Sequence, residues 1–188
     1  MKCSTIVKEI QSKRVDEVTD SLIRALVVGE DHRNALHFGV DPIAILRSIK
    51  VRVFEGKRQG ASTIEQQLVR TVTGRYEKTP RRKIREQILA VMLNSKFEKD
   101  DLACCYLTVA YYGASLVGVS GLRKLSSSNP HFTDEVIVAH LKYPRTSNPD
   151  GVVAKKHLSR VNHIRRLLEA KSTGLFLQRS SRAFPESP

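Results

Sequence analysis

The sequence predicts a mostly α-helical protein, and three observations carry this prediction. Apolar residues recur at helical spacing through most of the longer segments. Several of those segments begin with residues that favour helix starts. In addition, no segment shows a convincing alternation of apolar and polar residues, the pattern of a half-buried strand. With 188 residues, the chain is expected to form one domain with appendages.

The charge of the chain is strongly one-sided. There are 32 Lys and Arg against 19 Asp and Glu, a formal net charge of +13. Such a chain attracts nucleic acid, an anionic membrane surface or phosphorylated substrates. Nucleic-acid binding is the least favoured of the three, because Trp is absent and no base-reading motif is recognisable. Cys3, Cys104 and Cys105 fit neither a disulfide framework nor a CxxC metal site.

Targeting signals are not apparent in the sequence. The first residues contain no apolar run of signal-peptide length. Nowhere do about eighteen apolar residues follow one another, so no membrane span is expected. These observations predict either a soluble, cytoplasmic chain or a truncated piece that lacks its targeting segment.

The first predicted helix leads to a pair of acids. Residues 1–14 are expected to form a loose arm or a short helix, and residues 15–28 a helix with Leu22, Ala25 and Leu26 inward. Gly29 is expected to end this helix. Two acids follow, Glu30 and Asp31. They are either solvated charges at a helix end, or one of them is a general base, and the pattern leaves both interpretations open.

The next predicted helix is basic and amphipathic. It begins at Pro42, because proline is favoured at the first helical position. Its apolar stripe consists of Ile43, Leu46, Ile49 and Val53. Its cations are Arg47, Lys50, Arg52, Lys57 and Arg58. The spacing alone favours a membrane-surface helix and an ordinary surface helix equally.

A third helix start is indicated by the segment QGASTIEQQLVR. Ser62 followed by Glu65 matches a capping box, so a helix is expected to start there with Ser62 as its cap. The amides at such a start suit an anion, although a well-capped helix without further function explains the same pattern. Arg70 lies two turns further along.

A fourth helix is predicted from Thr79 and Pro80, as N-cap and first helical residue. Within it, Glu86 follows Arg82 by four residues and Lys83 by three, so these side chains can pair. They form either a surface salt bridge or a carboxylate that is held ionised by cations able to bind a phosphate.

The remaining chain is also expected to be helical up to a disordered tail. We expect helices over residues 98–112, 114–125, 133–143 and 152–171, the first of them ending at Gly113. Residues 172–188 are expected to form a disordered basic tail.

Two acids on separate helices suggest glycosyl-transfer chemistry. One carboxylate would act as base on an attacking hydroxyl, and the other would help to manage charge at the departing group. A phosphate or pyrophosphate leaving group needs cations around it, and Arg70, Arg82 and Lys83 are suitable.

The order of the motifs resembles one known family. The chain contains GED with H.G.D, then QGASTIEQQLVR, RRKIRE, KDDLACCYLTVAYYG and LKYPRTSNPDG. This series resembles the peptidoglycan glycosyltransferases (glycosyltransferase family 51), the transglycosylase domains of bifunctional penicillin-binding proteins and their monofunctional relatives. The similarity runs from about Val15 to Leu168.

The resemblance implies a fold, a reaction and partners. It implies a lysozyme-like helical head with a small membrane-contacting jaw, a transglycosylase domain over residues 15–171, and a jaw at about 45–58. The implied reaction polymerises lipid II into glycan strands by inverting transfer, with release of polyprenyl pyrophosphate. The implied partners are lipid II, the growing glycan strand, the membrane surface and cell-wall synthesis proteins, with no nucleic acid. The implied location is the outer face of the bacterial cytoplasmic membrane.

The resemblance also assigns the site residues. Glu30 matches the general base and Glu86 the second essential acid, which some accounts place near a divalent metal. The resemblance implies no certain cofactor, and it leaves open whether Mg²⁺ or Mn²⁺ binds at Glu86. The residues that match substrate-binding positions are Asp31, His37, Ser62, Thr63, Gln67, Arg70, Arg82 and Lys83.

This chain departs from the family pattern in several places. The family pattern has a phenylalanine at the position of Asn34, a glycine at Ala61, a threonine at Glu65, a lysine at Arg70, and asparagines at Thr71 and Thr108. The family's N-terminal transmembrane anchor is also not expected within these residues, because no apolar run is long enough. These differences support an alternative: a catalytically weak or inactive member that binds lipid-linked cell-wall precursor or cell-wall partners.

Overall fold

The computed structural model describes residues 5, 7–8, 15–57, 60–128, 132–146, 148 and 150–182. The elements in chain order are α2 (Asp20–Glu30), η1 (Asn34–Leu36), α3 (Pro42–Glu55), α4 (Ile64–Thr73), α5 (Pro80–Asn94), α6 (Lys99–Val109), β1 (Tyr111–Gly113), β2 (Leu116–Val117), α7 (Gly118–Ser128), α8 (Asp134–Lys142) and α9 (Gly151–Arg182). The predicted mostly α-helical class is therefore confirmed. The lysozyme-like arrangement stays a prediction.

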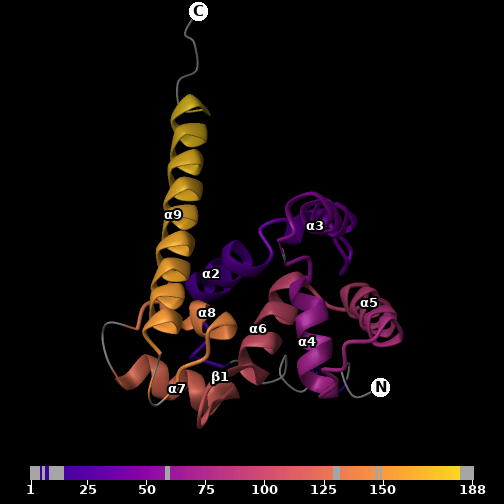
Figure 1. The fold of residues 1–188 in the computed structure, drawn as a ribbon. Helices are drawn as coiled ribbons and strands as arrows, with labels where there is room; N and C mark the ends of the chain where they lie inside the picture. Colours follow the sequence, from indigo (N-terminus) through magenta and orange to yellow (C-terminus); the bar gives the residue numbers. More distant parts are fainter. Residues whose placement is uncertain are drawn as a thin grey trace, which may run out of the picture.

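The core lies around helix α6. Helix α4 packs against α6 and α5, while α2 packs against α6, α8 and α9 (Figure 1). Leu22, Ala25 and Leu26 of α2 are buried there, as their spacing predicts. This packing brings the end of α2 and the start of α4 together, and the site lies at that junction.

The end of α2 differs from the sequence prediction. The helix begins at Asp20 with Thr19 as its cap, and it continues through Gly29 to Glu30 instead of ending at the glycine. A Cβ atom at Gly29 would lie 3.1 Å from a Val138 methyl group and 3.2 Å from one of Ile164. Gly29 is thus explained by the close approach of α8 and α9 rather than by a helix end.

The predicted cap of α4 is wrong by one residue, whereas the predicted cap of α5 and the predicted start of α3 at Pro42 are confirmed. Thr63, not Ser62, is the N-cap, and its hydroxyl accepts a hydrogen bond from the amide of Gln66. Asp41 caps α3 and Thr79 caps α5, each followed by a proline. The shift leaves the Ser62 hydroxyl available to the side chains of the site.

The segment after α6 is a hairpin, where the sequence predicts the end of one helix at Gly113 and the start of a short helix at residue 114. Helix α6 ends at Val109, and β1 pairs with β2 in an antiparallel ladder. Arg145 extends β1 on its other side, where its amide donates to the carbonyl of Tyr112 (2.8 Å). Gly113 has φ +149°, and a Cβ atom there would lie 2.3 Å from the Arg145 carbonyl oxygen. The glycine therefore permits this third strand-like contact.

Helix α3 stands apart from the other helices and has an apolar exposed face (Figure 1). Ala44 is its only buried residue. Ile43, Leu46, Ile49, Val53 and Phe54 are all more than half exposed. The predicted apolar stripe thus faces away from the core, which is unusual for a contiguous group of large apolar side chains. Among the described residues, no helix is long and apolar enough to cross a membrane.

Helix α9 is longer than predicted. It continues to Arg182, through the first part of the segment that was expected to be a disordered tail. The hydroxyl groups of Ser172 and Thr173 donate to the carbonyls of Leu168 and Glu169, four residues earlier, and no proline interrupts the helix. Residues 183–188 lie outside the described part.

Most of the predicted N-terminal arm also lies outside the described residues. Within residues 1–14, Thr5, Val7 and Lys8 are described and helical. Val7 is only 1% exposed and belongs to the core cluster, which fits the short-helix alternative at these positions.

Candidate active site

The carboxylate of Glu30 is held at the end of α2 by two other helices. Gln67 of α4 donates through Nε2 to Glu30 Oε2 (3.2 Å). Arg160 of α9 donates through Nη2 to Glu30 Oε1 (2.9 Å). Tyr106 of α6 in turn donates to Gln67 Oε1 (2.8 Å) and so fixes the orientation of the amide. Each carboxylate oxygen still has a second acceptor position, so these contacts leave room for a substrate hydroxyl.

Asp31 is buried behind Glu30 and ties α2 to α4. Its side chain is 6% exposed. Its Oδ2 accepts hydrogen bonds from the Ile64 amide (3.2 Å), the Asn34 side chain (3.4 Å) and His37 Nε2 (3.0 Å). A fully bonded buried carboxylate of this kind fixes backbone positions. In the structure Asp31 therefore positions its neighbour Glu30, while its predicted contact with substrate stays a prediction.

His37 is also buried, and its hydrogen bonds indicate one tautomer. The Gly39 amide donates to Nδ1 (3.2 Å), so Nδ1 is an acceptor and the proton lies on Nε2, facing Asp31. The Gly39 carbonyl accepts from the Thr63 hydroxyl (2.7 Å). The loop after α2 is thereby tied to the start of α4.

Replacing Gly39 with Ala is expected to destabilise this loop severely. Gly39 has φ +86°, and a Cβ atom would lie 2.5 Å from the Ala90 carbonyl oxygen of α5. Gly74 provides the control, since it also has a positive φ (+64°) but its Cβ would meet nothing within 4 Å. Both changes carry the left-handed strain of about 1–2 kcal/mol, and the overlap adds about 1–3 kcal/mol at Gly39 alone. Urea unfolding measures the free energy of unfolding of both variants. Equal losses in the two variants would contradict the close approach of Gly39 to α5.

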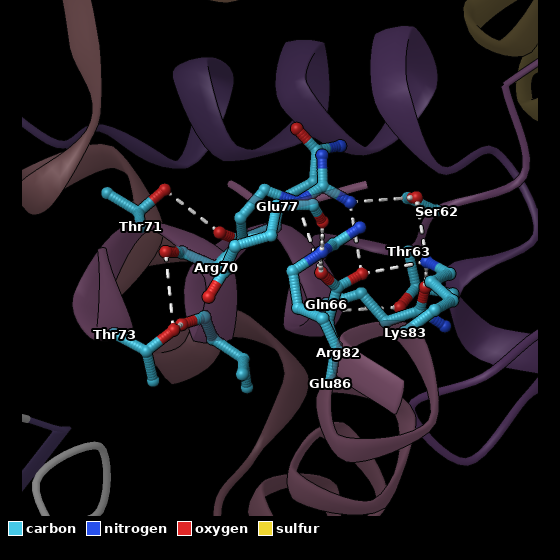
Figure 2. Close-up of polar contacts among 12 residues, drawn as sticks. Ser62, Thr63, Gln66, Arg70, Thr71, Thr73, Glu77, Arg82, Lys83 and Glu86 are labelled. Carbon is cyan, nitrogen blue, oxygen red and sulfur yellow. Dashed lines mark hydrogen bonds and ion pairs between the residues drawn. The ribbon is translucent and has the colours of Figure 1, made fainter. Parts of the chain in front are cut away.

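Glu86 forms the second half of the site, inside a group of cations. Its carboxylate, 2% exposed, accepts from Arg70 Nη2 (3.0 Å) and Lys83 Nζ (2.7 Å), and it also pairs with Arg82. The Ser62 hydroxyl lies 3.1 Å from Lys83 Nζ and 3.3 Å from Arg70 Nη2 (Figure 2). The surface salt-bridge reading of Glu86 is therefore wrong, because helix packing buries this carboxylate.

Burial and charge act against each other on these groups. Burial by itself would raise the pKa of Glu86, but the hydrogen bonds and charges of Arg70 and Lys83 outweigh it and lower that pKa. Burial lowers the pKa of Lys83, and the carboxylate of Glu86 only partly offsets this effect. The group is thus a carboxylate kept ionised by an excess of positive charge.

Helix α4 joins the two halves. Gln67 faces Glu30, and Arg70, about one turn further on, faces Glu86. The structure thus brings the predicted residues into two adjoining groups. Glu30, Gln67, Asp31, His37 and Thr63 form the first, and Glu86, Ser62, Arg70, Arg82 and Lys83 form the second.

Sequence reasoning missed three contributors to the site. Tyr106 of α6 is absent from the predicted site, and its hydroxyl fixes Gln67. Lys99 reaches Glu65 Oε1 (2.5 Å), although Glu65 was interpreted as a capping residue. Arg160 carries no local signal, since it lies 130 residues from Glu30 in the chain. Only the packing of α9 against α2 shows its contact.

The described residues do not fit a divalent cation well. Around Glu86, three cations already share one carboxylate. The donor atoms of Asp31, His37 and Glu65 lie within 4.8 Å of one another. However, the ammonium group of Lys99 lies at Glu65 and 3.4 Å from His37 Nδ1, where it supplies the positive charge. A metal ion in either place would repel these side chains.

The departures from the family pattern leave the two acids in place. Asn34 is buried and donates to Asp31 (3.4 Å), so it supports the first half of the site. The hydroxyls of Thr71 and Thr108 are turned back to carbonyls of their own helices, at Gln67 and Cys105. These two residues do not contact Glu30 or Glu86 through the hydrogen bonds described.

The fold and the site together define a class of protein. It is a helical domain with two carboxylates in adjoining groups, one at a helix end and one within a group of cations, and this arrangement resembles the paired acids of glycosyl-transfer sites. The chain belongs to the transglycosylase family, whose model matches residues 4–128.

Curated relatives agree with this family. Penicillin-binding protein 1A of Escherichia coli is 33% identical over 154 residues, which cover 77% of this chain and 18% of that protein. Penicillin-binding protein 1A of Vibrio cholerae is 31% identical over 186 residues, covering 93% of this chain and 22% of the relative. The chain thus spans about a fifth of the length of these relatives.

Proposed function

We propose that the chain is a peptidoglycan glycosyltransferase that polymerises lipid II into glycan strands with release of polyprenyl pyrophosphate. The observation that carries this proposal is the pair of adjoining acid groups on α2 and α5, connected through α4. Membership of the transglycosylase family supports it.

Glu30 is the general base in this proposal. As the 4-hydroxyl of the acceptor sugar attacks the anomeric carbon of the donor, Glu30 takes the hydroxyl proton. The bond between that carbon and the pyrophosphate oxygen breaks, and its electron pair leaves with the pyrophosphate. Because attack and departure take place on opposite faces, the configuration is inverted. Gln67 and Arg160 keep the carboxylate oriented for the proton transfer.

The cations around Glu86 bind the leaving group in this proposal. Arg70, Arg82 and Lys83 share one carboxylate, so the positive charge there exceeds the negative charge by two. A pyrophosphate can compete for these donors and be stabilised as its charge grows during bond breaking. Glu86 keeps the three side chains together when no donor is bound.

The exposed face of α3 contacts the membrane in this proposal, at the outer face of the bacterial cytoplasmic membrane. A lipid-linked donor keeps its polyprenyl chain in the bilayer, so the site must lie close to it. The apolar stripe of α3, with Arg47, Lys50 and Arg52 beside it, suits an anionic bilayer surface.

Replacing Leu46 and Phe54 of α3 with Glu is expected to reduce binding to vesicles. The two side chains are 67% and 80% exposed, so the fold does not depend on them. Burial of each unchanged side chain in the bilayer would contribute about 1.5–3 kcal/mol to binding. Binding of the variant to phosphatidylglycerol–phosphatidylcholine vesicles should therefore fall at least about tenfold. Leu158→Glu on α9, at a residue 60% exposed, is the control. Equal losses in both proteins would contradict the assignment to α3.

The proposed function is tested by incubating the purified chain with labelled lipid II in detergent, with and without Mg²⁺. Glycan polymer is the expected product. A second candidate function is binding without turnover, supported by the departures at Asn34, Ala61, Thr71 and Thr108. Saturable binding of lipid II with no polymer would establish this second function instead.

A further inference from the structure

The contact between Arg160 and Glu30 connects the end of α2 with the middle of α9. Arg160 Nη2 donates to Glu30 Oε1 (2.9 Å), and the same nitrogen donates to the carbonyl of Gly29. The two charged side chains are 15% and 14% exposed. An ion pair so far withdrawn from water is stronger than a surface pair. Arg160 also lies outside residues 4–128, which match the family model.

Arg160 supplies charge that Gln67, the other side chain that donates to Glu30, lacks. Gln67 is an uncharged donor, and the last turn of α2 contains no basic residue of its own. The positive charge near this helix end is therefore provided by α9, where it stabilises both the terminal carbonyl and the carboxylate. A planar guanidinium can reach both acceptors at once, whereas an ammonium group acts as a point charge.

We infer that Arg160 is a positioning residue of the candidate active site, which holds the Glu30 carboxylate in the orientation needed for proton transfer. The inference rests on the proposed role of Glu30 as the base. It makes α9 part of the working site, because the orientation of Glu30 then depends on how α9 is docked against α2.

The kinetic test uses Arg160→Gln and Arg160→Lys, with Arg165→Gln as the matched control. Arg165 is on the same helix and pairs with Glu135 at 3.6 Å, but it is 47% exposed. With labelled lipid II, kcat should fall at least about tenfold in Arg160→Gln while KM stays within about twofold, because a misplaced base slows the proton transfer without removing a donor contact.

The control and the conservative variant complete this test. Arg160→Lys should recover part of the lost kcat, and Arg165→Gln should retain normal kinetics. Equal kcat values for Arg160→Gln and Arg165→Gln would overturn the inference. A rise in KM at unchanged kcat would also overturn it, because that pattern indicates a substrate contact.

A second measurement does not depend on catalysis. Thermal unfolding of Glu30→Gln, Arg160→Gln and the double variant forms a cycle, and Glu135→Gln with Arg165→Gln forms a parallel one. In the first cycle, the change in Tm of the double variant should differ from the sum of the single changes by about 2–4 °C. In the cycle of the exposed pair, the changes in Tm should nearly add. Additive shifts in the first cycle would overturn the pairing. Coupling in a chain that makes no polymer would mean that the proposed function fails while the Glu30–Arg160 pairing is supported.

Discussion

Replacing Glu30 with Gln is expected to abolish glycan polymer formation while leaving lipid II binding largely intact. The amide has nearly the same size and keeps an oxygen that can accept from Arg160, but it cannot take a proton from the acceptor hydroxyl. General-base catalysis contributes about 10²–10⁴-fold to rate, so polymer should fall below detection in an assay of ordinary sensitivity. The measurement is polymerisation of labelled lipid II, with binding followed separately by fluorescence.

The control for this prediction is Glu98→Gln. Glu98 is exposed, precedes α6, and makes no side-chain capping hydrogen bond. This variant should polymerise like the unchanged chain. Turnover near normal in Glu30→Gln would remove Glu30 from the role of base. Loss of both binding and turnover would indicate instead that the end of α2 had been disturbed, which the Tm of the variant would show.

The sequence predicts the helical class and most helix starts because these depend on local chemistry. Pro42 and Pro80 follow a capping side chain, Asp41 or Thr79, and both caps form as the residue types require. The resemblance in motif order predicts that the acids at positions 30 and 86 belong to one site. The structure places them in adjoining groups joined by α4, and their shared role in one active site stays a prediction. The degree to which each of these two carboxylates is buried could not be predicted from residue spacing.

The errors occur where tertiary packing overrides a local signal. Gly29 has the chemistry of a helix end, but it is required where α8 and α9 approach α2. Glu65 has the spacing of a capping residue, but it is turned inward to pair with Lys99. In both cases another element of the fold determines the outcome, and the sequence around the residue contains no trace of that element.

Contacts across long separations in the chain are missed for the same reason. Arg160 lies on a helix whose apolar residues at helical spacing, including Val161 and Ile164, form a buried stripe. Nothing in that pattern distinguishes Arg160 from Arg165 or Arg166. The distinction arises only when α9 packs beside α2 and places one of these cations against Glu30.

Replacing Glu86 with Gln is expected to reduce both stability and turnover. The carboxylate is the shared partner of Arg70, Arg82 and Lys83, and it is almost completely buried. Breaking a buried ion pair by removing one partner costs about 3–5 kcal/mol. The cations here are 15–33% exposed, and water can partly replace the lost partner. We therefore expect a loss of about 2 kcal/mol in the free energy of unfolding at pH 7.

The pH dependence distinguishes this charge effect from a packing effect. Because the folded-state pKa of Glu86 is lowered, its contribution is complete above the ordinary value of 4.5 and disappears as the pH falls through the folded pKa. The difference in unfolding free energy between the unchanged chain and Glu86→Gln should therefore be largest at neutral pH and shrink below about pH 4.5. Urea unfolding between pH 3 and pH 7 measures it.

Glu77→Gln is the matched control, because Arg82 contacts the backbone carbonyl of Glu77 rather than its carboxylate. Its stability should follow that of the unchanged chain at every pH. If Glu86→Gln lost the same stability at all pH values, the loss would come from packing, and the three cations would not depend on the charge of Glu86. Polymerisation by Glu86→Gln should also fall by about 10²-fold or more, since the cations that are proposed to receive the pyrophosphate would repel one another without their shared carboxylate.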